Sequence, residues 1–178
     1  MTLAWHLKRW SGTGLRHIPA GSPYDVLDFR FAGRGVDNRW NETGSPTLYL
    51  AGDEGVLIAE WGRHFAMHRT AQLQQMTVER STFTLELSID AVLDVRSEEV
   101  CNALSLDNAP SRFADIGVAR ATANFVRSTT EAQALLVPSL GLLDDLERWC
   151  LVVFLEKLPP DPRSFVSAVT PRGLLRWG

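Results

Sequence analysis

Within residues 81–89, the apolar side chains of Phe83, Leu85, Leu87 and Ile89 are in strict alternation with polar ones. Because successive side chains of a strand point to opposite faces, this alternation predicts a β-strand with one face buried. Such a strand is stable only beside partner strands and under an apolar layer. The chain is therefore expected to build a sheet with a covered face.

Further strands are predicted from short apolar segments that end at turn-forming residues. They cover residues 15–21, 46–51, 134–139, 148–155 and 164–169, and residues 92–95 either extend the strand at 81–89 or form a short neighbour. In residues 46–51, the alternation places Leu48 and Leu50 on one face and Tyr49 on the other.

Two segments have the apolar spacing of helices. One begins near Glu54 after the capping residue Asp53, and the other begins at Ser111, a natural N-cap. Strands outnumber helices and no regular β–α repeat is present, which predicts an α+β fold. We expect residues 1–178 to form a single domain with its core at about residues 15–155. Neither of the common glycine-rich phosphate-binding loops occurs, which disfavours a doubly wound nucleotide-binding fold.

The charge balance and the cysteines limit the classes of partner and compartment. A net charge of −3 argues against direct nucleic-acid binding and against an anionic membrane surface. No apolar segment approaches membrane-spanning length. Cys101 and Cys150 lie far apart without metal-site spacing, so they are predicted to be buried free thiols. We expect a cytoplasmic protein without membrane association.

Several kinds of catalytic or metal site find little support in the sequence. Glu60, His64 and His68 have i, i+4, i+8 spacing on one helix, but a zinc site would need another ligand and the His-Glu-x-x-His signature is absent. We therefore predict no metal. A Gly-x-Ser-x-Gly nucleophile elbow is absent too. Asp53 and Glu54 are poorly spaced from Glu60 for a glycosidase pair.

One set of side chains remains with a coherent chemistry: Arg16, Arg39, Tyr49, Glu60 and Ser139. Arginines offer forked donors to phosphate oxygens, an aromatic ring stacks on a flat heterocycle, and a carboxylate stabilises a developing positive charge. Together they describe a pocket for a dinucleotide. Each residue on its own also fits an ordinary structural role, such as a solvated turn or the surface of a helix.

A series of short motifs, in one order, resembles the RES-domain family. The series is Arg39-Trp40-Asn41, Gly44-Ser45-Pro46, Leu48-Tyr49-Leu50-Ala51 and Ala59-Glu60, with Leu15-Arg16-His17 before it and Leu136-Val137-Pro138-Ser139 after it. The likeness therefore runs from about Arg16 to Ser139. The family comprises toxins of bacterial RES-Xre toxin–antitoxin pairs, which have a fold related to ADP-ribosyltransferases and degrade NAD.

The resemblance implies a mixed, split β-sheet core with flanking helices, as in ADP-ribosyltransferases. It implies an NAD glycohydrolase or NAD phosphorylase, with NAD as substrate, no prosthetic group, and inorganic phosphate as co-substrate in the phosphorolytic case. Catalytic roles fall to Glu60, Arg39 and Tyr49. Substrate-binding roles fall to Arg16 and Ser139, with Arg30 in reserve as the alternative first arginine.

The same resemblance implies partners and leaves other functions open. The implied partners are a cognate Xre-type antitoxin protein that occludes the pocket, and further copies of the chain in a homo-oligomer. Two alternative functions stay open: transfer of ADP-ribose to a macromolecule, and a non-catalytic RES-like module that only binds a protein.

Overall fold

The computed structural model describes residues 3–33, 38–68 and 78–177, without the side chains of residues 64–68 and 177. The strands are β1 (Leu7–Pro19), β2 (Thr47–Ala51), β3 (Val78–Asp94), β4 (Ala134–Pro138), β5 (Trp149–Phe154) and β6 (Val166–Trp177). The helices are α1 (Glu54–His68), α2 (Glu98–Ala103) and α3 (Ile116–Thr129). This arrangement confirms the predicted α+β class.

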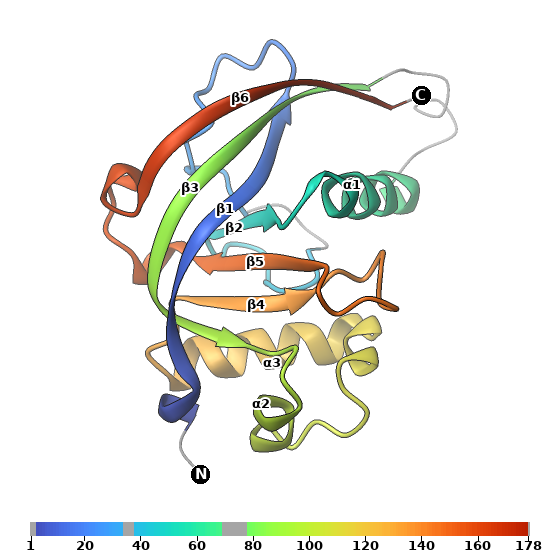
Figure 1. Cartoon of the computed structure of the whole chain (residues 1–178), viewed down its shortest axis with the longest axis vertical. Coiled ribbons are helices and arrows are strands. Elements are labelled where there is room, and N and C mark those ends of the chain that lie inside the picture. Colours follow the sequence, from blue (N-terminus) through green and yellow to red (C-terminus); the bar gives the residue numbers. More distant parts are fainter. Residues whose placement is uncertain (1–2, 34–37, 69–77, 178) are drawn as a thin grey trace.

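The sheet has two halves that share only limited pairing (Figure 1). The long, curved strands β1, β3 and β6 pair in antiparallel fashion. The shorter strands β2, β5 and β4 form the second half. At one junction β3 runs parallel to β4 over three residue pairs, and at the other β1 meets β2 in the single pair Leu15–Ala51. Beyond that pair β1 and β2 diverge, which splits the sheet.

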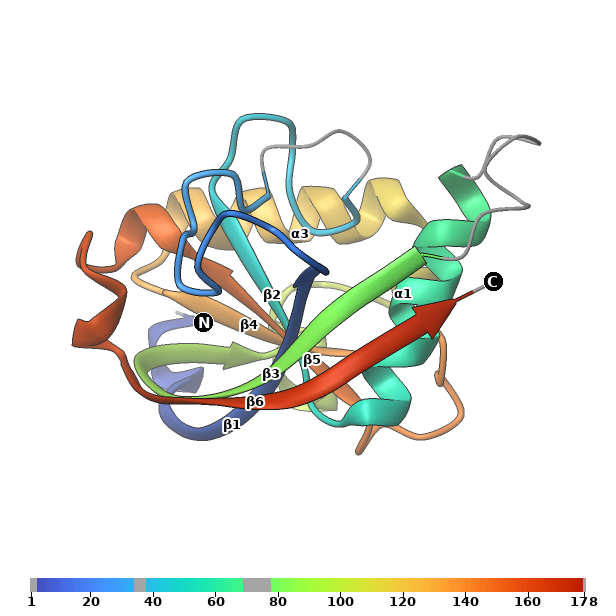
Figure 2. The ribbon, with the colours of Figure 1, turned by 90° about the horizontal axis from the view of Figure 1, so that it is seen from above.

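The short strands lie between α3 and the long, curved strands (Figure 2), and each side of them is covered by an apolar layer. One layer lies between the two halves of the sheet and contains Leu85 and Leu87 of β3 with Leu48 and Leu50 of β2. The other lies between the short strands and α3. Tyr49 packs against this second layer, so the predicted orientation of the β2 side chains is confirmed.

The first and third strands are longer than the sequence predicts. β3 is one strand of 17 residues that joins the predicted segments 81–89 and 92–95. β1 has 13 residues and begins well before residue 15, because residues 7–19 pair with β3 along most of its length. This long pairing is a tertiary contact, and the glycine-interrupted sequence of β1 does not reveal it.

The N-terminus of α3 differs from the prediction. Ser111 opens a 3-10 turn (Ser111–Ala114), and Asp115 caps α3 by accepting hydrogen bonds from the amides of Gly117 and Val118 at 2.7 and 3.3 Å. Ile116 therefore becomes the first residue of the helix. Among the described residues, no helix is long and apolar enough to cross a membrane.

Candidate active site

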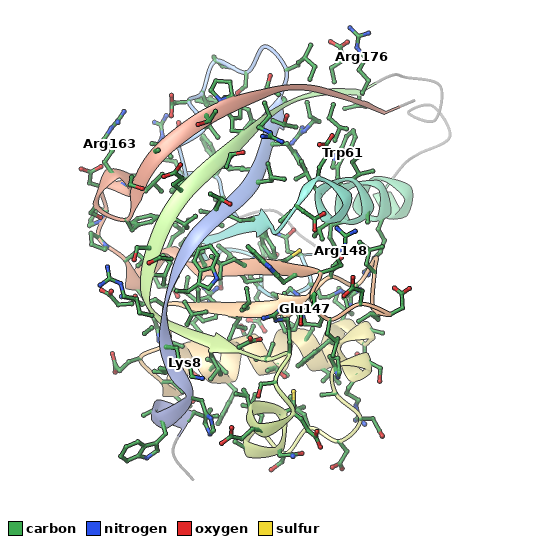
Figure 3. The ribbon with its side chains drawn as sticks, viewed as in Figure 1. Lys8, Trp61, Glu147, Arg148, Arg163 and Arg176 are labelled. Carbon is green, nitrogen blue, oxygen red and sulfur yellow. The ribbon has the colours of Figure 1, made fainter. Side chains whose placement is uncertain are left out.

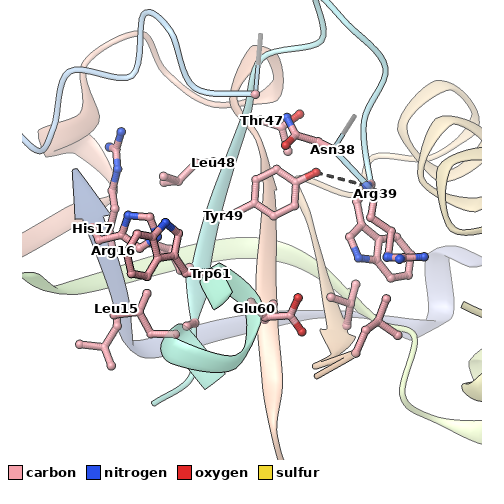
Figure 4. A pocket seen from close by; sticks show the side chains of 18 of the residues that line it. Leu15, Arg16, His17, Asn38, Arg39, Thr47, Leu48, Tyr49, Glu60 and Trp61 are labelled. Atoms are coloured by element: carbon pink, nitrogen blue, oxygen red, sulfur yellow. Dashed lines mark hydrogen bonds between the residues drawn. The ribbon is translucent and has the colours of Figure 1, made fainter. Parts of the chain in front are cut away.

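A cavity of about 400 Å³ opens where β1 and β2 diverge (Figure 4). Its walls come from β1, β2, the first half of α1, the end of β4 and the turn at residues 38–40. The volume falls within the range of ~300–1,000 Å³ that is usual for small-molecule sites. The split of the sheet thus creates a pocket between elements that are distant in the sequence.

Most of the charged side chains that line this cavity are positive. Arg16, Arg39, Arg63 and Arg80 line it, and Glu60 is the single carboxylate among the described lining residues. Arg16 lies on one side and Arg39 on the other, with Tyr49 and Glu60 between them (Figure 4). A ligand that fits this field carries anionic groups and places a cationic or partly cationic centre near Glu60.

Glu60 is held in a fixed orientation on α1. The hydroxyl of Ser139 and the amide of Gly141 both donate to its Oε1 atom, at 2.8 and 3.0 Å. Hydrogen bonds to a charged acceptor are about twice as strong as neutral ones. Because both donors engage the same oxygen, these bonds leave Oε2 for a ligand.

Ser139 contacts the carboxylate of Glu60 from the side that faces away from the cavity. Its side chain is fully buried and it is absent from the cavity lining, whereas Pro138 and Leu140 on either side are lining residues. The sequence predicted that this serine binds substrate. The structure places it in the wall, where it contacts Glu60.

Gly141 approaches α1 so closely that no side chain fits. A Cβ atom on this residue would lie 2.8 Å from the Cβ atom of Ala59, and carbon atoms in contact lie about 3.5–4.0 Å apart. The loop that carries Gly141 is tied to the start of α1 by an ion pair between Arg148 and the capping residue Asp53. Figure 3 shows Arg148 beside α1. Both contacts keep the loop against the carboxylate.

The guanidinium of Arg39 is anchored and still reaches the cavity. Its Nη1 atom donates to the carbonyl oxygens of Phe113 and Ala114 at 3.0 and 2.8 Å. Burial lowers the pKa of Arg39, and the nearby charge of Arg63 lowers it further, while Glu60 opposes both effects. The anchored fork can present its remaining N–H groups to an anionic ligand.

Tyr49 contributes its ring to the cavity and its hydroxyl to the wall. The hydroxyl donates to Oδ1 of Asn41 at 2.6 Å and accepts from the amide of Trp40 at 3.2 Å. Burial raises the pKa of Tyr49, so the phenol stays protonated at neutral pH. Trp40 itself packs on Phe113 with ring centroids 4.9 Å apart. The Arg-Trp-Asn turn is therefore fixed in place by three different side-chain contacts.

Arg16 is a buried cation at the cavity wall. It donates to the carbonyl oxygen of Val26, and its guanidinium lies 4.7 Å from the ring centroid of Phe29. Burial lowers the pKa of Arg16 to about 10, against the opposing charges of Asp28 and Asp25. This pKa still leaves the guanidinium charged at neutral pH.

Arg30, the reserve for the first arginine, lies outside the cavity. It is exposed and forms a fork with Asp28, with N···O distances of 2.8 and 2.6 Å. It is not among the lining residues, so Arg16 is the first arginine that reaches the site.

The cavity also contains residues to which the sequence analysis gave no role in the site: His17, Trp61, Arg63, Arg80 and Cys150. His17 and Trp61 pack edge to face, with ring centroids 5.7 Å apart. Their positions next to Arg16 and Glu60 in the sequence were the available signal for these two residues. Arg80 had none, because it reaches the cavity only through the pairing of β3 with β1.

Both cysteines are free, but only Cys101 is buried as predicted. Cys150 is partly exposed and lines the cavity. Its thiol has a pKa well above the ordinary value because of burial and the nearby carboxylates of Glu60 and Asp53. It is therefore a neutral thiol at neutral pH.

The histidines of the predicted helical ladder, His64 and His68, have side chains outside the described part of the chain. Among the side chains that are described, no three His, Cys, Asp or Glu groups gather in the manner of metal ligands.

The chain is similar to one known protein family and to a chain of a solved structure. The sequence model of the RES domain matches residues 14–177. A chain in the crystal structure of the M. tuberculosis MbcT–MbcA toxin–antitoxin complex has a similar fold, with a TM-score of 0.60 at 21% identity. The superposition covers 96% of this chain and 86% of that chain. The comparison with curated proteins gives no match.

Proposed function

The chain belongs to the RES domain family, and we propose that it is an NAD-degrading toxin of a bacterial toxin–antitoxin system. In this proposal it cleaves the bond between nicotinamide and ribose by hydrolysis or phosphorolysis. The observation that supports the proposal most directly is that Glu60, the one carboxylate among the described lining residues, is held in a cavity with four arginines.

NAD matches the charges of the cavity. Its diphosphate is anionic and suits the arginines, whereas its nicotinamide ring is a cationic pyridinium and suits the neighbourhood of a carboxylate. Nicotinamide departs as a neutral molecule when the glycosidic bond breaks, so the leaving group needs no general acid. One carboxylate is then enough for the reaction.

Glu60 supplies the electrostatic contribution to catalysis. As the bond to nicotinamide lengthens, positive charge develops on the ribose carbon and ring oxygen, and a nearby carboxylate stabilises that charge. Because Ser139 and Gly141 hold Oε1, the carboxylate does not have to reorganise during the reaction. Water then adds to the ribose carbon and loses a proton, which yields ADP-ribose. Inorganic phosphate in the place of water yields ADP-ribose-1''-phosphate.

The other predicted residues position the substrate. Arg16 and Arg39 bind phosphate oxygens from opposite sides of the cavity, and the ring of Tyr49 packs against the nicotinamide ring or its ribose. The hydroxyl of Tyr49 keeps that ring in place through Asn41. Ser139 acts through Glu60.

An antitoxin protein is the proposed partner. The similar chain was crystallised in a toxin–antitoxin complex, and a partner that covers the mouth of this cavity would block access to NAD. In this proposal the cell is protected because the cavity is closed while the antitoxin is bound.

The test is incubation of the purified protein with NAD, with and without inorganic phosphate, followed by identification of the products. Nicotinamide with ADP-ribose indicates hydrolysis, and nicotinamide with ADP-ribose-1''-phosphate indicates phosphorolysis. ADP-ribose mass on a macromolecule would instead identify a transferase. If the protein neither changes NAD nor gains thermal stability from it, the proposal is wrong and a binding module is the better description.

A further inference from the structure

Arg80 lies at the end of the cavity that also contains Arg16 and His17. It is located on β3 directly opposite Pro19 of β1, and its Nε atom donates to Nδ1 of His17 at 3.0 Å. Since Nδ1 accepts this bond, the imidazole carries no proton on that nitrogen. Figure 4 shows His17 beside Arg16, across the cavity from Arg39.

Arg80 is a half-buried cation that has no carboxylate partner within the described part of the chain. Among the described residues, no Asp or Glu oxygen lies within 4.0 Å of its guanidinium, whereas Arg148 and Arg127 each have such a partner. Burial lowers the pKa of Arg80, and no carboxylate of the described residues opposes that effect. Removing a cation from water without a counter-charge is unfavourable, so buried charges are normally paired or bind a ligand.

The bond to His17 orients the guanidinium of Arg80 for ligand binding. It uses Nε and fixes the plane of the guanidinium, and it leaves the two terminal nitrogens for other acceptors. A fixed arginine fork loses less entropy on binding phosphate than a mobile side chain does. The arrangement therefore resembles a phosphate-binding group whose orientation is set by the protein.

We infer that Arg80, oriented by His17, is a further substrate-binding residue that binds a phosphate group of the nucleotide at the Arg16 end of the cavity. The inference rests on the proposed function for the identity of the substrate. The binding contacts of Arg80 require only a nucleotide with a phosphate or diphosphate group. Glu60 remains the residue at the reaction centre, and Arg80 contributes affinity rather than chemistry.

Binding of ADP to the full chain tests this inference without any catalysis. Arg80→Met keeps the length of the side chain and removes the charge, and it is expected to raise the dissociation constant for ADP about tenfold or more, as expected for a lost charge-assisted hydrogen bond. The matched control is Arg163→Met. Arg163 is exposed and points away from the molecule, so this variant should bind ADP within twofold of wild type (Figure 3).

Thermal stability separates a binding role from a structural one. Because no carboxylate of the described residues neutralises the half-buried charge of Arg80, Arg80→Met should unfold at the same temperature as wild type or higher when no ligand is present. The same variant should lose most of the increase in unfolding temperature that ADP gives to wild type. A lower unfolding temperature together with unchanged ADP affinity would show that Arg80 is structural and would overturn the inference.

The role of His17 is tested by a pair of substitutions. His17→Leu removes the acceptor of the Arg80 bond and should weaken ADP binding several-fold. His17→Asn places an amide oxygen near the position of Nδ1 and should restore part of that affinity. Equal affinity of both variants and wild type would contradict the proposed orientation of Arg80 by His17.

Kinetics with NAD distinguish a failure of this inference from a failure of the proposed function. Arg80→Met should raise KM for NAD about tenfold while kcat changes less than threefold. If wild type consumes NAD and Arg80→Met has unchanged KM and ADP affinity, the inference alone fails. If wild type binds ADP through Arg80 but never consumes NAD, the proposed reaction fails and the phosphate subsite stands.

Discussion

The hydroxyl of Ser139 lies 2.8 Å from Oε1 of Glu60, although 79 positions separate the two residues in the sequence. The contact forms because β4 ends beside the first half of α1, at the place where the sheet splits. Gly141 adds its amide to the same oxygen at 3.0 Å. In the proposed reaction these two donors orient the one carboxylate on which the chemistry depends.

Replacing Ser139 by alanine removes one of these donors. A hydrogen bond to a charged group contributes about 1.5–3 kcal/mol, which corresponds to roughly 10- to 100-fold in rate if the bond acts in the transition state. We expect kcat for NAD to fall by about that factor with little change in KM, measured by steady-state release of nicotinamide. Ser128→Ala, at an exposed position in α3, is the control and should keep full activity. Unchanged kcat in Ser139→Ala would contradict the role given to this serine.

Replacing Gly141 by alanine should reduce activity through a steric contact. The added Cβ atom would lie 2.8 Å from the Cβ atom of Ala59, so the loop must move away and its amide leaves Glu60. We expect kcat to fall at least tenfold on the same grounds as for Ser139→Ala.

A second substitution should reverse that loss. Ala59→Gly removes the opposing methyl group, and the double variant Ala59→Gly with Gly141→Ala should recover most of the activity. A glycine in the helix costs about 1 kcal/mol of stability, so activity must be compared well below the unfolding temperature. Failure of the double variant to recover would show that the close approach is not the cause.

The two parts of the Tyr49 side chain are expected to have different roles: the hydroxyl stabilises the fold, and the ring faces the ligand. Tyr49→Phe leaves Oδ1 of the buried Asn41 and the amide of Trp40 without their partner, which should lower the free energy of unfolding by about 1–3 kcal/mol. Because the ring remains in the cavity, kcat should stay within a few-fold of wild type. Tyr49→Leu removes the ring and should lower kcat much further. Chemical denaturation and nicotinamide release measure the two effects, and a fully active Tyr49→Leu variant would contradict this division.

Cys101 should make stability depend on alkaline pH. Its buried thiol donates to the carbonyl of Val95, and burial with the nearby Asp94 raises its pKa from 9.0 to about 11. The unfolded chain then releases this proton at lower pH than the folded chain does. The contribution of this thiol to the free energy of unfolding is complete below pH 9 and is lost as pH rises to about 11. It amounts to at most ~3 kcal/mol. Cys101→Ala should unfold with a weaker dependence on pH across this range, and equal pH dependence would contradict the prediction.

Local patterns in the sequence predicted the elements that carry the site. The alternation around Tyr49 and the capped helix that carries Glu60 depend on neighbouring residues, and both elements appear where they were expected. The α+β class followed from the same kind of pattern. The long pairing of β1 with β3 is different, because it depends on a match between segments about 70 positions apart.

Side-chain roles were harder to predict than elements for the same reason. Ser139 was expected to contact substrate, but its direction depends on the way β4 meets α1, which leaves it buried behind Glu60. Arg80 reaches the cavity only through the register between β3 and β1, and no local motif marks it. Arg30 carries the charge expected of a site residue, but its exposed loop pairs it with Asp28 instead.

Release of nicotinamide from NAD by wild type, Glu60→Gln and Glu54→Gln shows whether the reaction depends on the charge of Glu60. Glutamine keeps an oxygen that can accept from Ser139 and Gly141, so Glu60→Gln removes the charge with little effect on the fold. Glu54 is exposed in the first turn of the same helix and provides the control. We expect release by wild type and by Glu54→Gln, and a rate at least about 100-fold lower for Glu60→Gln. Equal rates for wild type and Glu60→Gln would contradict this expectation.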